Sequence, residues 1–238
     1  MGASAWTAGS AGIAAAAVAG MAYAVRGRSS AVFGASVYHG DRSRHSLALT
    51  FDDGPSESTP ALLDLLARFD IRATFFMCGV NVHRLPHIAK AVAAAGHEIG
   101  NHSDTHPRFD FKSGGFIYHE LAEAQRKIGE ATGVSPKLFR APYGVRWFGL
   151  GAAQKRLDLL GVMWTIIGRD WRLSSAHVSA RVAGRARAGG IICLHDGRGV
   201  EPKPDVSATL GAVADTVPRL KQSGFRFETV SEILRRSV

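Results

Sequence analysis

The hydrophobic and polar positions of the chain follow two patterns that alternate along its length. Short apolar runs predict buried strands at residues 47–51, 96–100, 138–139, 166–168 and 190–194. Amphipathic segments predict helices at residues 59–69, 85–95 and 118–132. The third of these ends before Gly133, and glycine is typical of the position after a helix. Strands that alternate with helices predict an α/β domain with parallel strands.

Each of the five apolar runs is followed by polar residues that can act in catalysis or bind a metal. Taken singly, each has an ordinary explanation, such as a solvated turn, an ion-paired arginine, a helix-capping acid or a core histidine. Parallel α/β folds, however, build their functional sites where the strands end. Five such endings in one domain therefore favour a shared site. The five segments are residues 47–55, 101–107, 138–144, 166–171 and 190–197.

Two adjacent carboxylates, Asp52 and Asp53, follow the first run. Like charges side by side are costly unless a cation or a shared proton relieves the repulsion, so one carboxylate is predicted to bind a metal and the other to act as a base. His102 and His106 are four residues apart, and Pro107 favours a loop for this pair. Two imidazoles and one carboxylate form the ligand set of a catalytic zinc site, which Asp53, His102 and His106 would supply.

This order of motifs resembles the polysaccharide deacetylases of the NodB-homology type, carbohydrate esterase family four. The resemblance covers residues 46–238 and includes the tail at residues 217–230. It implies a single α/β catalytic domain, a distorted seven-stranded (β/α) barrel with parallel strands inside outer helices. It also implies a metal-dependent hydrolase that removes N-acetyl groups from N-acetylglucosamine units of a polysaccharide, peptidoglycan or chitin-like, and releases acetate.

The resemblance also assigns roles to individual residues. Asp52 would be the general base held by Arg140, and His195 the general acid oriented by Asp170. The acidic metal ligand would be Asp53, completed by His102 and His106. The substrate-binding residues would be Tyr143, whose backbone N–H meets the oxyanion, Pro142 in the same turn, and Trp171 and Leu194 around the acetyl methyl group.

Physical chemistry supports the same division of labour, because an acetamide is a poor electrophile with a poor leaving group. A metal polarises the carbonyl, a carboxylate takes a proton from water, and a histidine protonates the departing amine. Mixed nitrogen and oxygen ligands suit Zn²⁺, with Co²⁺, Ni²⁺ or Mn²⁺ as substitutes.

Three alternatives stay open. An O-acetyl esterase acting on a polysaccharide such as acetylated xylan would use the same groups. A catalytically silent carbohydrate-binding protein should have lost one of Asp52, the metal ligands or His195, and all are present. A metal-free hydrolase of cyclic amides disagrees with the intact Asp-His-His set.

Two positions depart from the family pattern. Ile167 stands where a further acid is common, which weakens the network behind His195. Asp104 stands where a bulkier or aromatic residue is common, so its charge is expected to affect metal affinity or the sugar-binding rim.

Residues 1–28 form an alanine-rich hydrophobic segment with no charged side chain before Arg26, and residues 29–45 are predicted to be a linker. A membrane anchor or uncleaved signal is favoured. A signal cleaved after an A-x-A site at residues 22–24 and a soluble helix are the alternatives. The protein is thus expected in the membrane or exported to the cell envelope, in an orientation that stays open.

The net charge of +9 predicts an anionic cell-wall polymer or lipid surface nearby. Lysines and arginines are scattered and no nucleic-acid motif occurs, which argues against nucleic acid. A hydrophobic content of 46% excludes a disordered chain. Cys78 and Cys193 lie in apolar segments and are predicted to be buried free thiols, with a bridge between them as the alternative. No feature predicts an oligomeric state.

Overall fold

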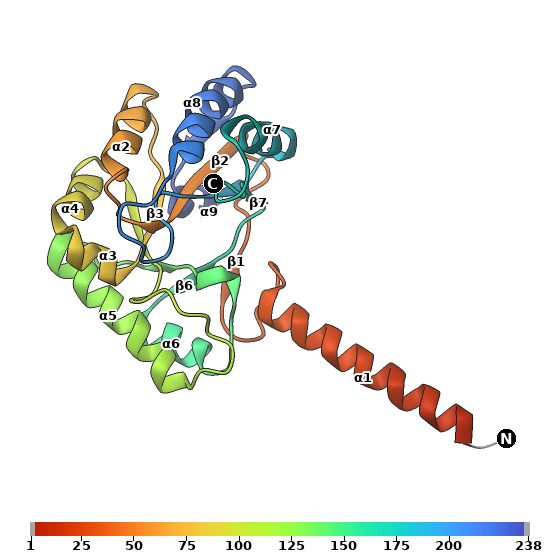
Figure 1. The fold of residues 1–238 in the computed structure, drawn as a ribbon. Helices are drawn as coiled ribbons and strands as arrows, with labels where there is room; N and C mark the ends of the chain where they lie inside the picture. The colour runs from red at the N-terminus through yellow and green to blue at the C-terminus, as the bar shows by residue number, and fades with distance from the viewer. Residues whose placement is uncertain (1–2, 236–238) are drawn as a thin grey trace.

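The protein is described by a computed structural model that covers residues 3–235, with the side chains of residues 14–235 (Figure 1). Its strands are β1 (Ser36–Val37), β2 (Ser46–Gly54), β3 (Thr74–Met77), β4 (Glu98–Asn101), β5 (Leu138–Phe139), β6 (Leu160–Val162), β7 (Ile166–Ile167), β8 (Gly190–His195) and β9 (Arg226–Glu228). Its helices are α1 (Ala3–Arg26), α2 (Thr59–Arg68), α3 (Gly79–Arg84), α4 (Pro86–Ala94), α5 (Gly114–Thr132), α6 (Leu150–Leu157), α7 (Ser175–Arg185), α8 (Ser207–Gln222) and α9 (Val230–Leu234), with a 3₁₀ turn η1 (Pro142–Gly144).

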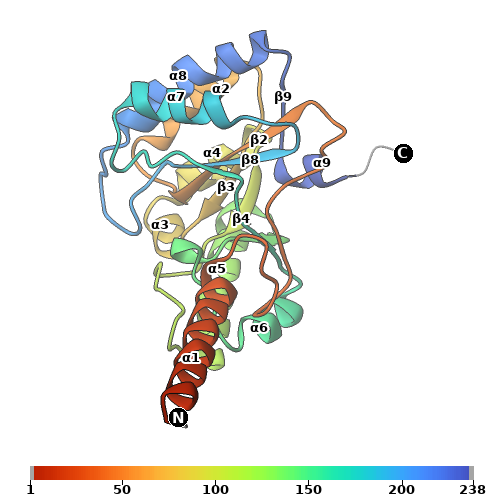
Figure 2. The same ribbon diagram turned by 90° about the vertical axis from the view of Figure 1, so that its right-hand side faces the viewer.

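The strands form one sheet in the order β1-β6-β5-β4-β3-β2-β8-β7, with β9 added beside β2. Every strand pairing in the described sheet is parallel. The sheet curls into a half-barrel, and helices such as α2, α4, α7 and α8 surround it (Figures 1 and 2). The predicted α/β architecture, with parallel strands inside outer helices, is confirmed, but the sheet of the described residues has nine strands where the family resemblance implied seven.

The central strand β2 is buried along all nine residues, because helices cover its outer face and other strands curl over its inner face. Leu49 and Phe51 point outward into a cluster with apolar residues of α2, α4, α7 and α8. Ala48 points inward and packs with Ile191 of β8 and Ile233 of α9. Since side chains alternate along a strand, the inner face changes from this apolar floor to polar residues at the carboxyl end.

The predicted helices are present at nearly the predicted positions, as α2, α4 and α5. The side chain of Ser113 caps α5 by accepting a hydrogen bond from the N–H of Phe116 at 3.1 Å. Helix α5 ends at Gly133, whose φ of 73° is left-handed and favours glycine. Local capping chemistry therefore explains why this end was predictable.

The N-terminal helix α1 projects away from the body of the protein (Figures 1 and 2). Within residues 3–235, no helix is both long enough and apolar enough to cross a membrane. The end of α1 contacts the body of the protein, where Ala24 is buried. Just after the helix, Arg28 donates a hydrogen bond to the carbonyl oxygen of Thr165 at 2.6 Å. Residues 29–45 include β1, which pairs with β6. The domain boundaries at residues 28 and 45 stay predictions.

Candidate functional site

A cavity of about 560 Å³ opens at the carboxyl ends of the strands. Seven of the predicted site residues line it: Asp52, Asp53, His102, His106, Tyr143, Trp171 and His195. Two others, Arg140 and Asp170, are buried behind this surface and bond to its residues. The curl of the sheet thus brings all five sequence segments to one place, as the strand endings predicted.

The turn after β2 brings both adjacent carboxylates into the cavity. In a regular strand, Asp52 and Asp53 would point to opposite faces. Here the pairing of β2 with β3 shifts register between Asp52 and Gly54, and Asp53 has a left-handed φ of 73°. This backbone distortion is what lets the two neighbours serve one site.

Arg140 holds Asp52 from the interior of the half-barrel. Its side chain is fully buried, and Nη1 donates to Asp52 Oδ1 at 2.6 Å and to the Thr50 hydroxyl at 2.7 Å. Its Nε donates to the carbonyl oxygen of Val162 at 3.1 Å, and its guanidinium carbon lies 4.1 Å from the ring centroid of Phe76. A buried cation with so many partners fixes the position of the Asp52 carboxylate.

Asp53, His102 and His106 form a candidate metal centre, as predicted. The Nε2 atoms of His102 and His106 lie 3.2 and 3.1 Å from Asp53 Oδ1, which is buried and receives no hydrogen bond. His102 Nδ1 lies 2.8 Å from the carbonyl oxygen of Arg140, so this nitrogen carries the proton and Nε2 offers a lone pair. An orphaned carboxylate oxygen facing two imidazoles fits a bound divalent ion.

Burial raises the pKa of the Asp53 carboxyl, but the imidazoles of His102 and His106 outweigh it. The pKa of Asp53 therefore lies well below its ordinary value. Its second oxygen, Oδ2, accepts the backbone N–H of Gly199 at 2.8 Å. Asp53 is thus ionised and oriented, as a metal ligand must be.

The loop that carries the two histidines is held by Glu120 of α5, which sequence reasoning missed. Glu120 is almost fully buried and accepts the backbone N–H groups of Asp104 at 3.0 Å and Thr105 at 2.8 Å. Ser103 and His106 both have left-handed φ values, of 64° and 59°. A buried acid on an amphipathic helix was the available signal, because buried carboxylates need such partners.

Asp104 lies in the same loop, but its charge does not face the cavity. Its carboxylate is buried and pairs with Lys127 Nζ of α5 at 2.7 and 2.9 Å. The expectation that Asp104 lies at the sugar-binding rim is therefore wrong, because Lys127 draws its carboxylate toward α5.

His195 stands on the opposite side of the cavity and is oriented by Asp170. His195 Nδ1 lies 2.9 Å from Asp170 Oδ1, and the backbone N–H of His195 donates to Oδ2 at 2.9 Å. The Thr209 hydroxyl donates to the same Oδ2 at 2.6 Å. Burial lowers the pKa of His195, but Asp170, with the charges of Asp53 and Asp52, outweighs it and raises this pKa to about 9. His195 is consequently protonated at neutral pH.

Tyr143 lies at the tip of the turn η1, on the rim beside the metal ligands. Its φ of 57° is left-handed, and its side chain is exposed with the ring centroid 4.6 Å from that of His106. The hydrogen bonds of this turn are donated by Gly144 and Val145 to Ala141 and Pro142, so they do not use the N–H of Tyr143.

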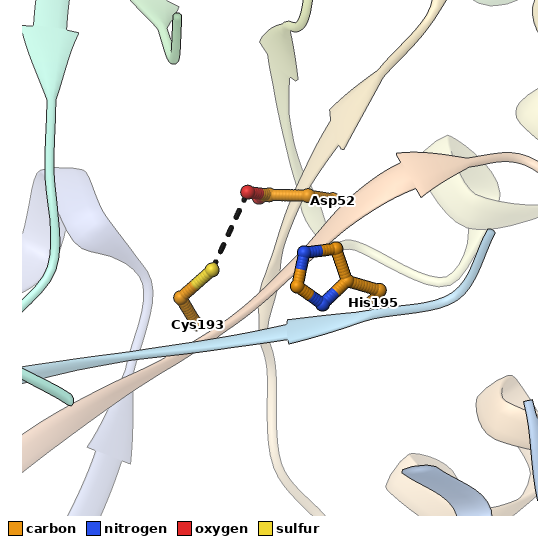
Figure 3. Close-up of side chains that lie close together, drawn as sticks. All are labelled: Asp52, Cys193 and His195. Atoms are coloured by element: carbon orange, nitrogen blue, oxygen red, sulfur yellow. Dashed lines mark hydrogen bonds between the residues drawn. The ribbon is translucent and has the colours of Figure 1, made fainter. Parts of the chain in front are cut away.

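Leu194 does not line the cavity, which corrects the sequence-based expectation. It is buried in the outer cluster with residues of α7 and α8, because alternation along β8 turns it away from His195. The same alternation turns Cys193 inward, where its Sγ donates to Asp52 Oδ2 at 3.4 Å (Figure 3). Cys193 is one of the cavity residues that the sequence analysis did not identify, and counting back two residues from His195 would have found it. Ile167 also lines the cavity.

Cys193 and Cys78 are both buried free thiols, as predicted. Burial and the charge of Asp52 raise the pKa of the Cys193 thiol well above its ordinary value. The thiol is therefore protonated and acts as the donor to Asp52.

Three arginines stand at the edge of the cavity: Arg26, Arg108 and Arg198. Arg26 is the last residue of α1, so the N-terminal segment reaches the site. Arg108 pairs with Asp110 at 2.6 Å, and Arg198 donates to the carbonyl oxygen of Asp170 at 3.3 Å.

Comparisons with known proteins agree with this geometry. A family model described as polysaccharide deacetylase matches residues 39–159. The chain is 37% identical over 193 residues to a peptidoglycan-N-acetylglucosamine deacetylase of Bacillus cereus, covering 79% of this chain and 88% of that protein. It is 32% identical over 205 residues to a chitooligosaccharide deacetylase of Bradyrhizobium sp., covering 82% and 94%. A crystal structure of a peptidoglycan N-acetylglucosamine deacetylase in complex with an N-oxidanyl-benzamide aligns with a TM-score of 0.79 at 29% identity, covering 85% and 94%.

Proposed function

The chain belongs to the polysaccharide deacetylase family, and on this premise we propose that it hydrolyses N-acetyl groups on N-acetylglucosamine units of peptidoglycan or a chitin-like polymer. The observation that carries the proposal is one cavity that holds a metal-binding triad, an anchored carboxylate and a protonated histidine. The products are acetate and a glucosamine unit. A peptidoglycan substrate would place the enzyme in the cell envelope.

The metal centre is the first part of the mechanism. Asp53, His102 and His106 would hold a divalent ion, for which Zn²⁺ suits the nitrogen and oxygen donors. When bound, the ion supplies Lewis-acid polarisation of the acetyl carbonyl.

Asp52 acts as the general base. Arg140 occupies its Oδ1 atom, which leaves Oδ2 to accept a proton from the attacking water. Because Arg140 is itself fixed by buried partners, the carboxylate does not have to reorient when the water attacks. The backbone N–H of Tyr143, on the rim of the cavity, would meet the negative charge that develops on the carbonyl oxygen.

His195 acts as the general acid. Its Nδ1 is engaged with Asp170, so Nε2 carries the proton that is delivered to the departing amine. A pKa of about 9 keeps this proton in place at neutral pH. Trp171, whose ring centroid lies 5.0 Å from that of His195, and Ile167 bound the space for the acetyl methyl group.

The test is acetate release from N-acetylglucosamine oligomers and peptidoglycan by chelator-treated protein, with and without added Zn²⁺. We expect release that depends on the metal and is abolished in Asp52→Asn. Asp64→Asn, at an exposed position of α2, is the matched control and should behave as the unmodified protein. If fully metal-loaded protein releases acetate from acetylated xylan but from no amide substrate, it is an O-acetyl esterase. Release from no substrate at all would support the carbohydrate-binding alternative.

A further inference from the structure

A second group of potential metal ligands lies in the same cavity, beside the Asp53 centre. Asp52, Cys193 and His195 each offer one ligand atom, and these atoms lie within 4.8 Å of one another (Figure 3). The grouping follows from the sheet, because Asp52 of β2 pairs in register with His195 of β8. Cys193 lies two residues earlier on β8 and therefore on the same face.

Asp52 and His195 each have a ligand atom that the outer partner does not use, and these two atoms and Cys193 Sγ face the same space. Arg140 engages Oδ1 of Asp52, and Oδ2 faces the Cys193 thiol at 3.4 Å. Asp170 engages Nδ1 of His195, which leaves Nε2 for another partner. The outer partners thus orient the ligands, as they do in metal sites generally.

We propose that Asp52, Cys193 and His195 form a second, sulfur-containing metal site that binds a soft divalent cation such as Cd²⁺, or Zn²⁺ in excess. Ligands of a tetrahedral ion lie about 3.5 Å apart, so the group needs shifts of only about 1 Å to close around one. Binding replaces the thiol proton and any proton on Nε2, both of which pass to water, and no electrons are transferred. The sulfur ligand distinguishes this site from the Asp53 centre, which offers only nitrogen and oxygen.

An ion in this second site would engage the carboxylate and the imidazole to which the proposed function assigns proton transfer. The consequence, which rests on that function, is inhibition of acetate release by excess soft metal. The site itself does not depend on turnover and can be tested by metal binding alone.

The experiment is a Cd²⁺ titration of chelator-treated full-length protein, followed by equilibrium dialysis and by ultraviolet absorption of the sulfur-to-cadmium bond. In the unmodified protein we expect two bound equivalents of Cd²⁺ and a charge-transfer absorption from the sulfur-to-cadmium bond. Cys193→Ser should lose the absorption and one equivalent and keep the other, and the retained equivalent shows that the variant is folded. His195→Ala should also lose one equivalent. His102→Ala should lose the other equivalent and keep the absorption.

Cys78→Ser is the matched control, because Cys78 is the second buried free thiol and lies outside the three-residue group. It should keep both equivalents and the absorption. A single equivalent in the unmodified protein would overturn the proposal, and so would a Cys193→Ser variant that still binds two. Failure of acetate release would leave these binding results intact, so the proposed function and the second site fail separately.

Discussion

The two walls of the cavity position their functional side chains by different means. On the metal-binding wall, Asp53, Ser103 and His106 adopt left-handed backbone conformations that aim side chains where a regular strand or turn would not. On the opposite wall, Cys193 and His195 follow the ordinary alternation of β8.

This difference implies different needs for support. A left-handed conformation costs about 1–2 kcal/mol at a residue other than glycine, so surrounding contacts must maintain it. Glu120 provides such contacts for the loop between Ser103 and His106, and Arg140 fixes Asp52, the neighbour of Asp53. The regular strand needs only one side chain, Asp170, to orient the imidazole of His195. Removing a support should therefore distort the metal-binding wall. On the opposite wall it should change only the pKa and orientation of His195.

The largest effect is expected from Arg140→Met. It leaves the Asp52 carboxylate buried without its cation, which should cost about 3–5 kcal/mol of unfolding free energy and reduce acetate release by at least about 10²-fold. Urea unfolding and kcat/KM measure the two losses. Arg126→Met removes exposed ion pairs from α5 and should cost less than about 1 kcal/mol. Equal losses in both variants would contradict the supporting role of Arg140.

Asp170→Asn should have the next largest effect, on the opposite wall. Without the Asp170 charge, the pKa of His195 falls from about 9 toward its ordinary value. The proton needed by the departing amine is present below this pKa and lost above it, so the alkaline limb of the kcat/KM profile moves to lower pH. At pH 7.5 the smaller fraction of protonated His195 should by itself lower kcat/KM about tenfold.

The pKa shift can be measured directly by NMR titration of His195 in metal-free protein. Asp215→Asn, at an exposed acid on α8, is the control and should leave both the titration and the pH profile unchanged. An unaltered pKa in Asp170→Asn would show that Asp170 does not set the protonation of His195.

The two walls also differ in how far they could be predicted from sequence. The strand endings identified Asp52, Asp53 and His195, and the spacing of His102 and His106 identified a ligand pair. Alternation along β8 turns Cys193 toward the cavity and Leu194 toward the outer core. The family resemblance nevertheless assigned Leu194 to the cavity. An acid on the buried face of an amphipathic helix could have indicated Glu120, but its partners could not be predicted because they depend on the packing of α5 against a loop about 15 residues away in sequence.

Glu120→Gln should have a moderate effect, confined to the metal-binding wall. An amide can accept one of the bonds from Asp104 and Thr105 less strongly than a carboxylate, so the loop with His102 and His106 loosens. We expect metal affinity to fall about tenfold, with kcat largely recovered at saturating Zn²⁺. Competition with a chelator measures the affinity.

Glu123→Gln provides the comparison, because Glu123 lies on the same helix and pairs with Arg126 at the surface. It should bind metal as the unmodified protein does. Equal affinities in the two variants would refute a positioning role for Glu120.

The smallest effect is expected from Leu194→Met, which tests whether this residue belongs to the core or to the acetyl-binding space. As a core residue it should tolerate a side chain of similar volume, losing less than about 1.5 kcal/mol of stability, with kcat and KM unchanged. Ile167→Met makes a comparable change at a residue that lines the cavity and should raise KM by about tenfold. Steady-state kinetics on an N-acetylglucosamine oligomer separate the two. A rise in KM for Leu194→Met as large as that for Ile167→Met would place Leu194 in the substrate pocket. Alternation along β8 would then not determine which side chains contact the acetyl group.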